Sequence, residues 1–267
     1  KYHEEVKTYK VYSSAGDYVS LFYADFHPRS GKRGGAWMTS YKSQFVKNGE
    51  NVRPHISNVC NFTRSTPSKP SLLTFNEVTT LFHEFGHGLH GMLANTTYPS
   101  LSGTSVYWDF VELPSQIMEN WCYEKEALQL FATHYETGEV IPMDLIRKIK
   151  ESATFQEGMA TLRQLSFGLL DMSWHGVDPS EIRNVKLHEK RAFEGTQLYP
   201  DTEETCMSTS FSHIFQGGYS SGYYSYKWAE VLDADAFAYF KEKGIFNNEV
   251  ATKFKNNIIS KGGTEKP

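Results

Sequence analysis

The stretch Leu81-Phe82-His83-Glu84-Phe85-Gly86-His87 carries the strongest signal in this 267-residue chain. It places His83 and His87 four positions apart, with Glu84 directly after the first histidine. A helix turns by about 100° per residue, so the two imidazoles lie one turn apart on one face. Such a pair can bind one Zn²⁺, and Glu84 can act as general base on a zinc-bound water. The alternative is a helix that carries two histidines with no metal.

Signals for a helix surround this motif. Thr74-Phe75-Asn76-Glu77 has the spacing of a capping box, which predicts a helix over about 75–93. Its predicted apolar face consists of Val78, Leu81, Phe82, Phe85 and Leu89.

The remaining chain is mostly helical in pattern. Alternation and turn residues predict strands at 6–12, 18–26 and 52–62, the first two as a hairpin. Small and polar residues predict loops at 94–106 and 196–222. Apolar periodicity and helix-breaking residues predict further helices at about 107–128, 143–175, 179–194, 222–243 and 247–261. Pro114 suits a first turn, so the alternative start of the first of these is near Glu112, and Gly158 and Gly168 are candidate interruptions of the second. The sequence therefore predicts one mainly α domain over 1–267 with a small N-terminal β-sheet edge.

Composition excludes several classes of protein. Apolar residues make up 39% and charged residues 22%, which is typical of a globular domain with a sizeable core. The net charge of −4 gives no footprint for nucleic acid or a membrane surface. Three separated cysteines do not suggest a disulfide framework, so we expect a reducing compartment and a cytoplasmic location. The N-terminus resembles neither a signal peptide nor an initiating segment, which suggests a piece of a longer protein.

A catalytic zinc needs a third protein ligand and one open position. Position 93, where an extended motif has a third histidine, holds Leu93, and His90 reads better as a core or supporting residue. Glu112, on the next predicted helix, is the candidate third ligand. Glu119 lies two helical turns after Glu112 and is a candidate acceptor for the N–H group of a ligand histidine. The alternative is a solvent-exposed glutamate.

Two glycine-containing segments are candidates for the rest of the site. Within 211–226, His213, Tyr219, Tyr223 and Tyr226 stand among glycines and could donate hydrogen bonds to an oxyanion. An aromatic loop packed on the following helix is the alternative. The glycine pair in 31–37 permits unusual backbone angles or a close approach, unless it is an ordinary loop.

With these residues described, the chain resembles the thimet oligopeptidase family of zinc metallopeptidases, which includes oligopeptidase A and the bacterial peptidyl-dipeptidases. The motifs that carry the resemblance extend over most of the chain. They are Gly31-Lys32-Arg33-Gly34-Gly35-Ala36-Trp37, Phe82-His83-Glu84-Phe85-Gly86-His87-Gly88-Leu89-His90, Asp109-Phe110-Val111-Glu112-Leu113-Pro114-Ser115-Gln116, and His213 with Gly217-Gly218-Tyr219 and Tyr223-Tyr224-Ser225-Tyr226.

The resemblance implies a role for each matching residue. His83, His87 and Glu112 correspond to the ligands of one Zn²⁺, and Glu84 corresponds to the general base. The residues that correspond to substrate binding and oxyanion stabilisation are His213, Tyr219, Tyr223 and Tyr226.

The resemblance also implies a zincin-like catalytic domain that hydrolyses short peptides, as an oligopeptidase or a peptidyl-dipeptidase. Members of the family are longer and have a helical N-terminal part that forms the opposite wall of a channel. We therefore expect 1–267 to be the C-terminal, catalytic part of a longer parent, truncated at both ends, with the missing N-terminal part as a partner. The alternative is a zinc-binding fragment that is inactive alone.

Overall fold

Helix α1 (Phe75–Met92), which contains the two histidines of the motif, is the central element of the fold. The computed structural model describes residues 1–266. The backbone N–H of Glu77 donates to the Thr74 hydroxyl at 3.2 Å, and the Thr74 N–H donates to the Glu77 carboxylate at 2.8 Å. This reciprocal pair satisfies amide groups at the start of the helix that have no helical partner. The predicted capping box and the helix that follows it are both confirmed.

A mixed four-stranded sheet packs against α1, and its strand order is β1-β2-β6-β3. The β1–β2 pair is the predicted antiparallel hairpin, β6 runs parallel to β2, and β3 pairs antiparallel with β6. The strands β4 and β5 form a separate hairpin. Their bounds are β1 (Lys7–Tyr12), β2 (Tyr18–Asp25), β3 (Trp37–Lys42), β4 (Phe45–Lys47), β5 (Glu50–Val52) and β6 (His55–Val59).

Glycines allow α1 to approach its neighbours closely on two sides. A Cβ atom on Gly91 would lie 2.7 Å from Ile56 Cδ1 in the sheet. A Cβ atom on Gly86 would lie 2.1 Å from the carbonyl oxygen of Pro114 in α2 (Leu113–Glu119). Both distances are shorter than real contacts permit, so a side chain would force these elements apart. Helix α1 is therefore held between the sheet and the helix that follows Glu112.

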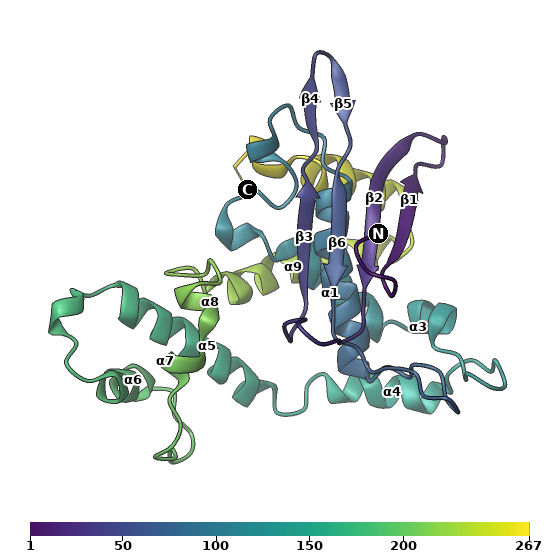
Figure 1. The fold of residues 1–267 in the computed structure, drawn as a ribbon. Helices are drawn as coiled ribbons and strands as arrows, with labels where there is room; N and C mark the ends of the chain where they lie inside the picture. The colour runs from purple at the N-terminus through teal and green to yellow at the C-terminus, as the bar shows by residue number, and fades with distance from the viewer. Residues whose placement is uncertain (267) are drawn as a thin grey trace.

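The chain is mainly α, with the sheet at its N-terminal end (Figure 1). In that view α5, α6 and α7 lie to one side of the sheet and of α1. No helix within residues 1–266 is both long enough and apolar enough to cross a membrane. The helices not yet given are α3 (Lys125–Phe131), α4 (Met143–Ser152), α5 (Glu157–His175), α6 (Val185–Phe193), α7 (Met207–Ser210), α8 (Ser212–Phe215), α9 (Ser225–Lys243) and α10 (Asn248–Phe254).

Three predicted helices are interrupted. The one expected over 107–128 is divided into a 3₁₀ turn, α2, a second 3₁₀ turn and α3. The break before α3 lies at Glu124, which adopts an extended conformation. The one over 143–175 divides into α4 and α5 at Gln156, whose φ of 56° is left-handed. The one over 179–194 begins as a 3₁₀ turn, and α6 starts only at Val185. Each break requires a backbone conformation that apolar periodicity does not encode.

The other differences concern the ends of elements, the size of the sheet and the predicted loops. The loop predicted at 196–222 contains two short helices, α7 and α8, and the loop predicted at 94–106 contains a 3₁₀ turn at Pro99–Leu101. The strand predicted at 52–62 is limited to β6, and β3 to β5 were not predicted. Helix α9 matches the prediction for 222–243 within three residues, whereas α10 passes into a π turn at Lys255–Ile259.

Candidate active site

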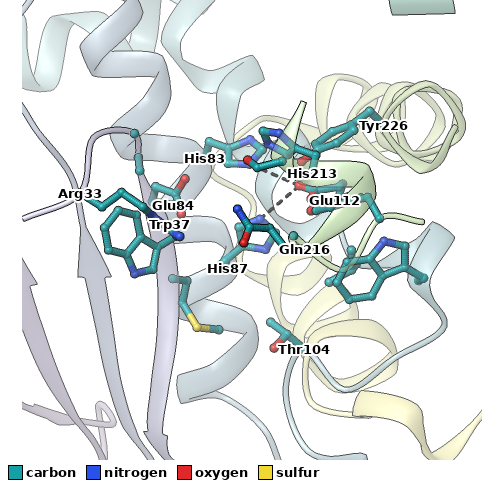
Figure 2. Close-up of a pocket in the computed structure, with 18 of the residues that line it drawn as sticks. Arg33, Trp37, His83, Glu84, His87, Thr104, Glu112, His213, Gln216 and Tyr226 are labelled. Atoms are coloured by element: carbon teal, nitrogen blue, oxygen red, sulfur yellow. Dashed lines mark hydrogen bonds and ion pairs between the residues drawn. The ribbon is translucent and has the colours of Figure 1, made fainter. Parts of the chain in front are cut away.

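Two helices bring the three predicted metal ligands together. His83 and His87 project from α1, and Glu112 stands directly before α2. The Nε2 atoms of His83 and His87 lie 3.3 Å and 3.1 Å from Glu112 Oε2. One ligand atom from each residue falls within 4.8 Å of the other two. Figure 2 shows both imidazoles turned towards the Glu112 carboxylate. Glu112 is thus close enough to share one ion with both histidines.

Glu112 is held in place by its surroundings. Its side chain is only 2% exposed. The Ser115 hydroxyl donates to Glu112 Oε2 at 2.9 Å, and the Tyr219 hydroxyl donates to Oε1. Burial alone raises the pKa of Glu112, but hydrogen bonds from His83 and His87 outweigh it and hold the pKa well below its usual range. The carboxylate is therefore ionised and available as an anionic ligand.

The predicted partner for a ligand histidine is Glu119. His83 Nδ1 lies 2.6 Å from Glu119 Oε1, on the side of the ring away from Glu112. Burial lowers the pKa of His83, but hydrogen bonds with Glu112 and Glu119 raise it to about 10. At that pKa both ring nitrogens carry a proton at neutral pH. A metal ion would replace the proton on Nε2, while Glu119 would keep the proton on Nδ1, which is the arrangement that carboxylate–histidine pairs impose at zinc sites.

The donor set suits zinc. Two imidazole nitrogens and one carboxylate oxygen are a known ligand set of catalytic zinc, which also keeps a position open to solvent. Glu84 follows His83 on α1 and is largely buried, and its Oε2 has no hydrogen-bond partner among the described residues. Burial, followed by the charges of Glu112 and Glu119, raises the pKa of Glu84 against the opposing effect of the histidines. A carboxylate with a raised pKa is better suited to accept and return a proton.

These residues face an open cleft of about 850 Å³. One wall is formed by the start of β3 and the loop before it, and the other by the region of α8 and the loop that follows. His213 and Tyr226 line the cleft on that side (Figure 2). Tyr219 lines the cleft as well. Residues from the sheet, from α1 and from the predicted aromatic segment thus meet around one cavity.

Two of the predicted tyrosines stack beside the carboxylate. The rings of Tyr219 and Tyr226 have centroids 5.1 Å apart and an interplanar angle of 18°. Burial, with the charge of Glu112, raises the pKa of both phenols far above neutrality. Both hydroxyls therefore stay protonated and can donate hydrogen bonds in the cleft. His213 is exposed, and its ring centroid lies 5.8 Å from that of Tyr219.

Tyr223 is placed differently. Its ring belongs to a buried cluster with Phe167 and Phe211, and its hydroxyl donates to Gln164 Oε1 at 3.3 Å. Burial raises the pKa of Tyr223 to about 12. Its side chain is not among those that line the cleft, and it contacts the site through the Tyr226 ring, with centroids 5.1 Å apart.

The sequence did not reveal the residue that holds the tyrosine loop. Asp171, on α5, is fully buried and accepts hydrogen bonds from the backbone N–H groups of Ser221 and Tyr223, each at 2.9 Å. His175 Nδ1 lies 2.8 Å from the same carboxylate. Ser221 has a left-handed φ of 56°. The only sequence signal was a polar residue within an apolar helical pattern.

Trp108 is a further cleft residue, and it falls within the helix predicted over 107–128. It lines the cavity and packs edge-on to Tyr219, with ring centroids 4.8 Å apart. A Cβ atom on Gly222 would lie 2.7 Å from the indole. The glycine therefore lets the tyrosine loop pack directly on Trp108.

His90 lies apart from the ligand set, as the sequence suggested. It is fully buried, and neither ring nitrogen has a hydrogen-bond partner among the described residues. Burial, with a smaller effect of His87, lowers its pKa to about 3. His90 is therefore a neutral core residue at physiological pH.

Comparison with known proteins identifies the family of this chain. A family model described as Peptidase family M3 matches residues 1–267. The chain belongs to this family. The match confirms the family that the sequence resembles.

Among curated relatives of this M3 chain, oligopeptidase A of Escherichia coli strain K12 is 45% identical over 270 residues, covering 100% of the chain and 40% of the relative. Organellar oligopeptidase A of Arabidopsis thaliana is 42% identical over 280 residues, covering 100% of the chain and 35% of the relative. Dipeptidyl carboxypeptidase of Escherichia coli strain K12 is 38% identical over 266 residues, covering 99% of the chain and 39% of the relative. The chain thus spans about two fifths of the length of these relatives.

Proposed function

We propose that this chain carries the catalytic centre of a zinc metallopeptidase with a zincin-like arrangement. His83, His87 and Glu112 would hold one Zn²⁺, and Glu84 would act as general base. The convergence of two imidazole nitrogens and one buried carboxylate within 4.8 Å, on the floor of an open cleft, is the observation that carries the proposal. Membership of Peptidase family M3 supports it.

The proposed reaction is hydrolysis of a peptide bond. Zinc, when bound, would polarise the scissile carbonyl and make water a stronger nucleophile at neutral pH. Glu84 takes the proton from the attacking water and then delivers it to the leaving amine.

The second wall of the cleft supplies donors for the charge that develops on the carbonyl oxygen. Tyr219, Tyr226 and His213 can donate hydrogen bonds there. Tyr219 donates to Glu112 in this structure. A cation held by Glu112 would offset the charge of this carboxylate, and the Tyr219 hydroxyl could then donate to substrate instead. Tyr223 supports the others by packing behind Tyr226.

The proposed substrates are short peptides, cleaved internally or in dipeptide units. The names oligopeptidase A and dipeptidyl carboxypeptidase belong to relatives at 45% and 38% identity, so both modes of cleavage remain in the proposal. We treat 1–267 as one catalytic domain of a longer protein. The cytoplasmic location remains a prediction, because the relatives include one named chloroplastic/mitochondrial and one named probable cytosolic.

A second candidate is a zinc-binding domain that needs the rest of its protein for activity. It is favoured by the alignment, in which the chain covers only 40% of oligopeptidase A. In this case the missing part would complete the substrate channel and would be the partner of this chain.

Replacement of Glu84 by glutamine tests the proposed function. The variant should bind zinc in the same ratio as the parental protein, and it should cleave a fluorogenic peptide at least ~100-fold more slowly, because a general base contributes that much or more. A chelator should abolish parental cleavage, and zinc should restore it. Unchanged cleavage by the zinc-loaded variant would remove Glu84 from the mechanism. Stoichiometric zinc without parental cleavage would favour the second candidate.

A further inference from the structure

The glycine-rich loop before β3 forms part of the catalytic cleft but has no role in the proposed hydrolysis. Arg33 is the only lysine or arginine among the residues that line the cavity. Figure 2 shows Arg33 and Trp37 beside Glu84, across the cavity from Glu112 and His213. The fixed positive charge of the cleft thus lies on the β-sheet wall.

The loop backbone is anchored from two sides. The Lys32 side chain is only 4% exposed and its Nζ lies 2.9 Å from Asp25 Oδ1, which fixes the residue next to Arg33. On the other side, Asn61 Nδ2 donates to the carbonyl oxygens of Arg33 and Gly35, at 3.0 Å and 2.7 Å. Gly35 has a φ of 92°, which favours glycine and turns the chain into β3. The Arg33 side chain therefore extends from a defined backbone.

Arg33 has no acidic partner within the described chain, residues 1–266. Its guanidinium carbon lies 5.0 Å from the centroid of the Trp37 ring, within range of a cation–π contact. In contrast, Arg29 and Arg64 each form an ion pair at 2.6 Å, with Asp25 and Glu5 respectively. Stacking on Trp37 restricts the guanidinium while its N–H groups remain free. A planar guanidinium with free donors is well suited to bind a carboxylate through two hydrogen bonds.

We propose that Arg33 is a subsite for a carboxylate of the peptide substrate. The proposal rests on the proposed function, because it places the peptide in the same cleft. Arg33 is the only lysine or arginine that lines the cleft, so an anionic group of a bound peptide gains most from contact with this wall. The carboxylate can be the C-terminus or the side chain of an aspartate or glutamate. Binding of the C-terminus would limit how far the peptide extends beyond the cleaved bond.

Direct binding, measured without turnover, tests this subsite. The zinc-loaded Glu84→Gln protein is titrated with fluorescent peptides of one parent sequence. One pair has a free C-terminus or a C-terminal amide, and a second pair has an internal aspartate or asparagine. Each is measured with Arg33 intact and with Arg33→Gln or Arg33→Lys. Arg147→Gln is the control, because Arg147 is exposed on α4 and is not among the cleft-lining residues.

Arg33→Gln should weaken binding about tenfold for the peptide that bears the recognised carboxylate, and less than about twofold for its neutral counterpart. Arg33→Lys should retain part of the preference, since lysine keeps the charge but loses the planar fork. If Arg33→Gln removes the preference for the free C-terminus over the amide, the carboxylate is the C-terminus. If it removes the preference for aspartate over asparagine, the carboxylate is a side chain. Equal loss for both members of each pair, or no loss, would overturn the proposal.

This readout is separate from hydrolysis. If Glu84→Gln cleaves peptides at the parental rate, the proposed function fails while a lost carboxylate preference still establishes the subsite. If hydrolysis depends on Glu84 but both peptide pairs bind equally well with Arg33 intact and with Arg33→Gln, the subsite alone is refuted. Failure of every peptide to bind with Arg33 intact also overturns it.

Discussion

Replacing Glu119 by alanine should weaken zinc binding about tenfold. The carboxylate accepts from His83 Nδ1 at 2.6 Å and so directs Nε2 towards Glu112. Loss of such a partner costs roughly 10–100-fold in metal affinity. The Glu119 side chain is 38% exposed, so water replaces part of the lost interaction and the lower end of that range applies. Tenfold corresponds to about 1.4 kcal/mol of binding free energy.

The assay is competition for zinc between the protein and a chromogenic chelator at neutral pH and fixed ionic strength. Glu119→Gln should fall between the parental protein and the alanine variant, because the amide oxygen can still accept from His83. Glu126→Ala is the matched control, since Glu126 is an exposed glutamate on α3 outside the site. An affinity for Glu119→Ala within twofold of parental, or an equal loss in the control, would refute the role of Glu119.

Three further changes test the fold around the site. Asp171→Asn should raise amide hydrogen exchange across 217–223 by about tenfold or more while zinc content stays constant. The substitution replaces one of the two carboxylate oxygens that accept from the backbone N–H groups of Ser221 and Tyr223 with an amide NH₂ donor. Exchange at the parental rate would exclude this anchor. The buried His90 has a pKa of about 3 in the folded state against 6.5 for a free histidine, so the unfolded state takes up its proton first as pH falls. The free energy of unfolding should therefore fall as the pH is lowered from 6.5 to about 5. Over this range, His90→Leu should lose about 1.5–2 kcal/mol less of its free energy of unfolding than the parental protein, as measured by denaturant unfolding. Equal losses in the two proteins would contradict a buried neutral histidine. Gly86→Ala should lower the free energy of unfolding by about 1–3 kcal/mol, since the new Cβ atom would lie 2.1 Å from the backbone of α2. Gly158→Ala, whose Cβ atom would have nothing within 4 Å, should raise the free energy of unfolding by about 0.5–1 kcal/mol. Similar effects of both substitutions would show that α1 and α2 are not in close contact.

The sequence predicted the elements whose signals are local. The helix that holds His83 and His87 has a capping box at its start and a motif spaced by one turn, and both signals lie within its own residues. The interrupted helix over 107–128 was predicted as continuous, because its apolar positions suit a single period. The extended backbone at Glu124 and the left-handed Gln156 were beyond such reasoning, since a change of conformation at one residue leaves the pattern of apolar positions unaltered.

The site shows the same division. Glu119 was found by counting two turns from Glu112, because that spacing survives in α2. Asp171 was missed because its partners lie 50 and 52 residues away in sequence, on a loop without periodicity. Tyr223 was grouped with Tyr219 because both stand in the same glycine-containing segment and both match the family motif, whereas the ring of Tyr223 packs in a buried cluster with Phe167 and Phe211.

An anomalous difference map recorded at the zinc absorption edge, from crystals of the zinc-loaded protein, tests the proposed centre most directly. We predict a single strong peak bonded to Nε2 of His83, Nε2 of His87 and a carboxylate oxygen of Glu112, with Glu84 beside it and not bonded to the ion. A strong peak elsewhere, or a map without a peak between these three residues, would contradict the proposed metal centre and the mechanism built on it.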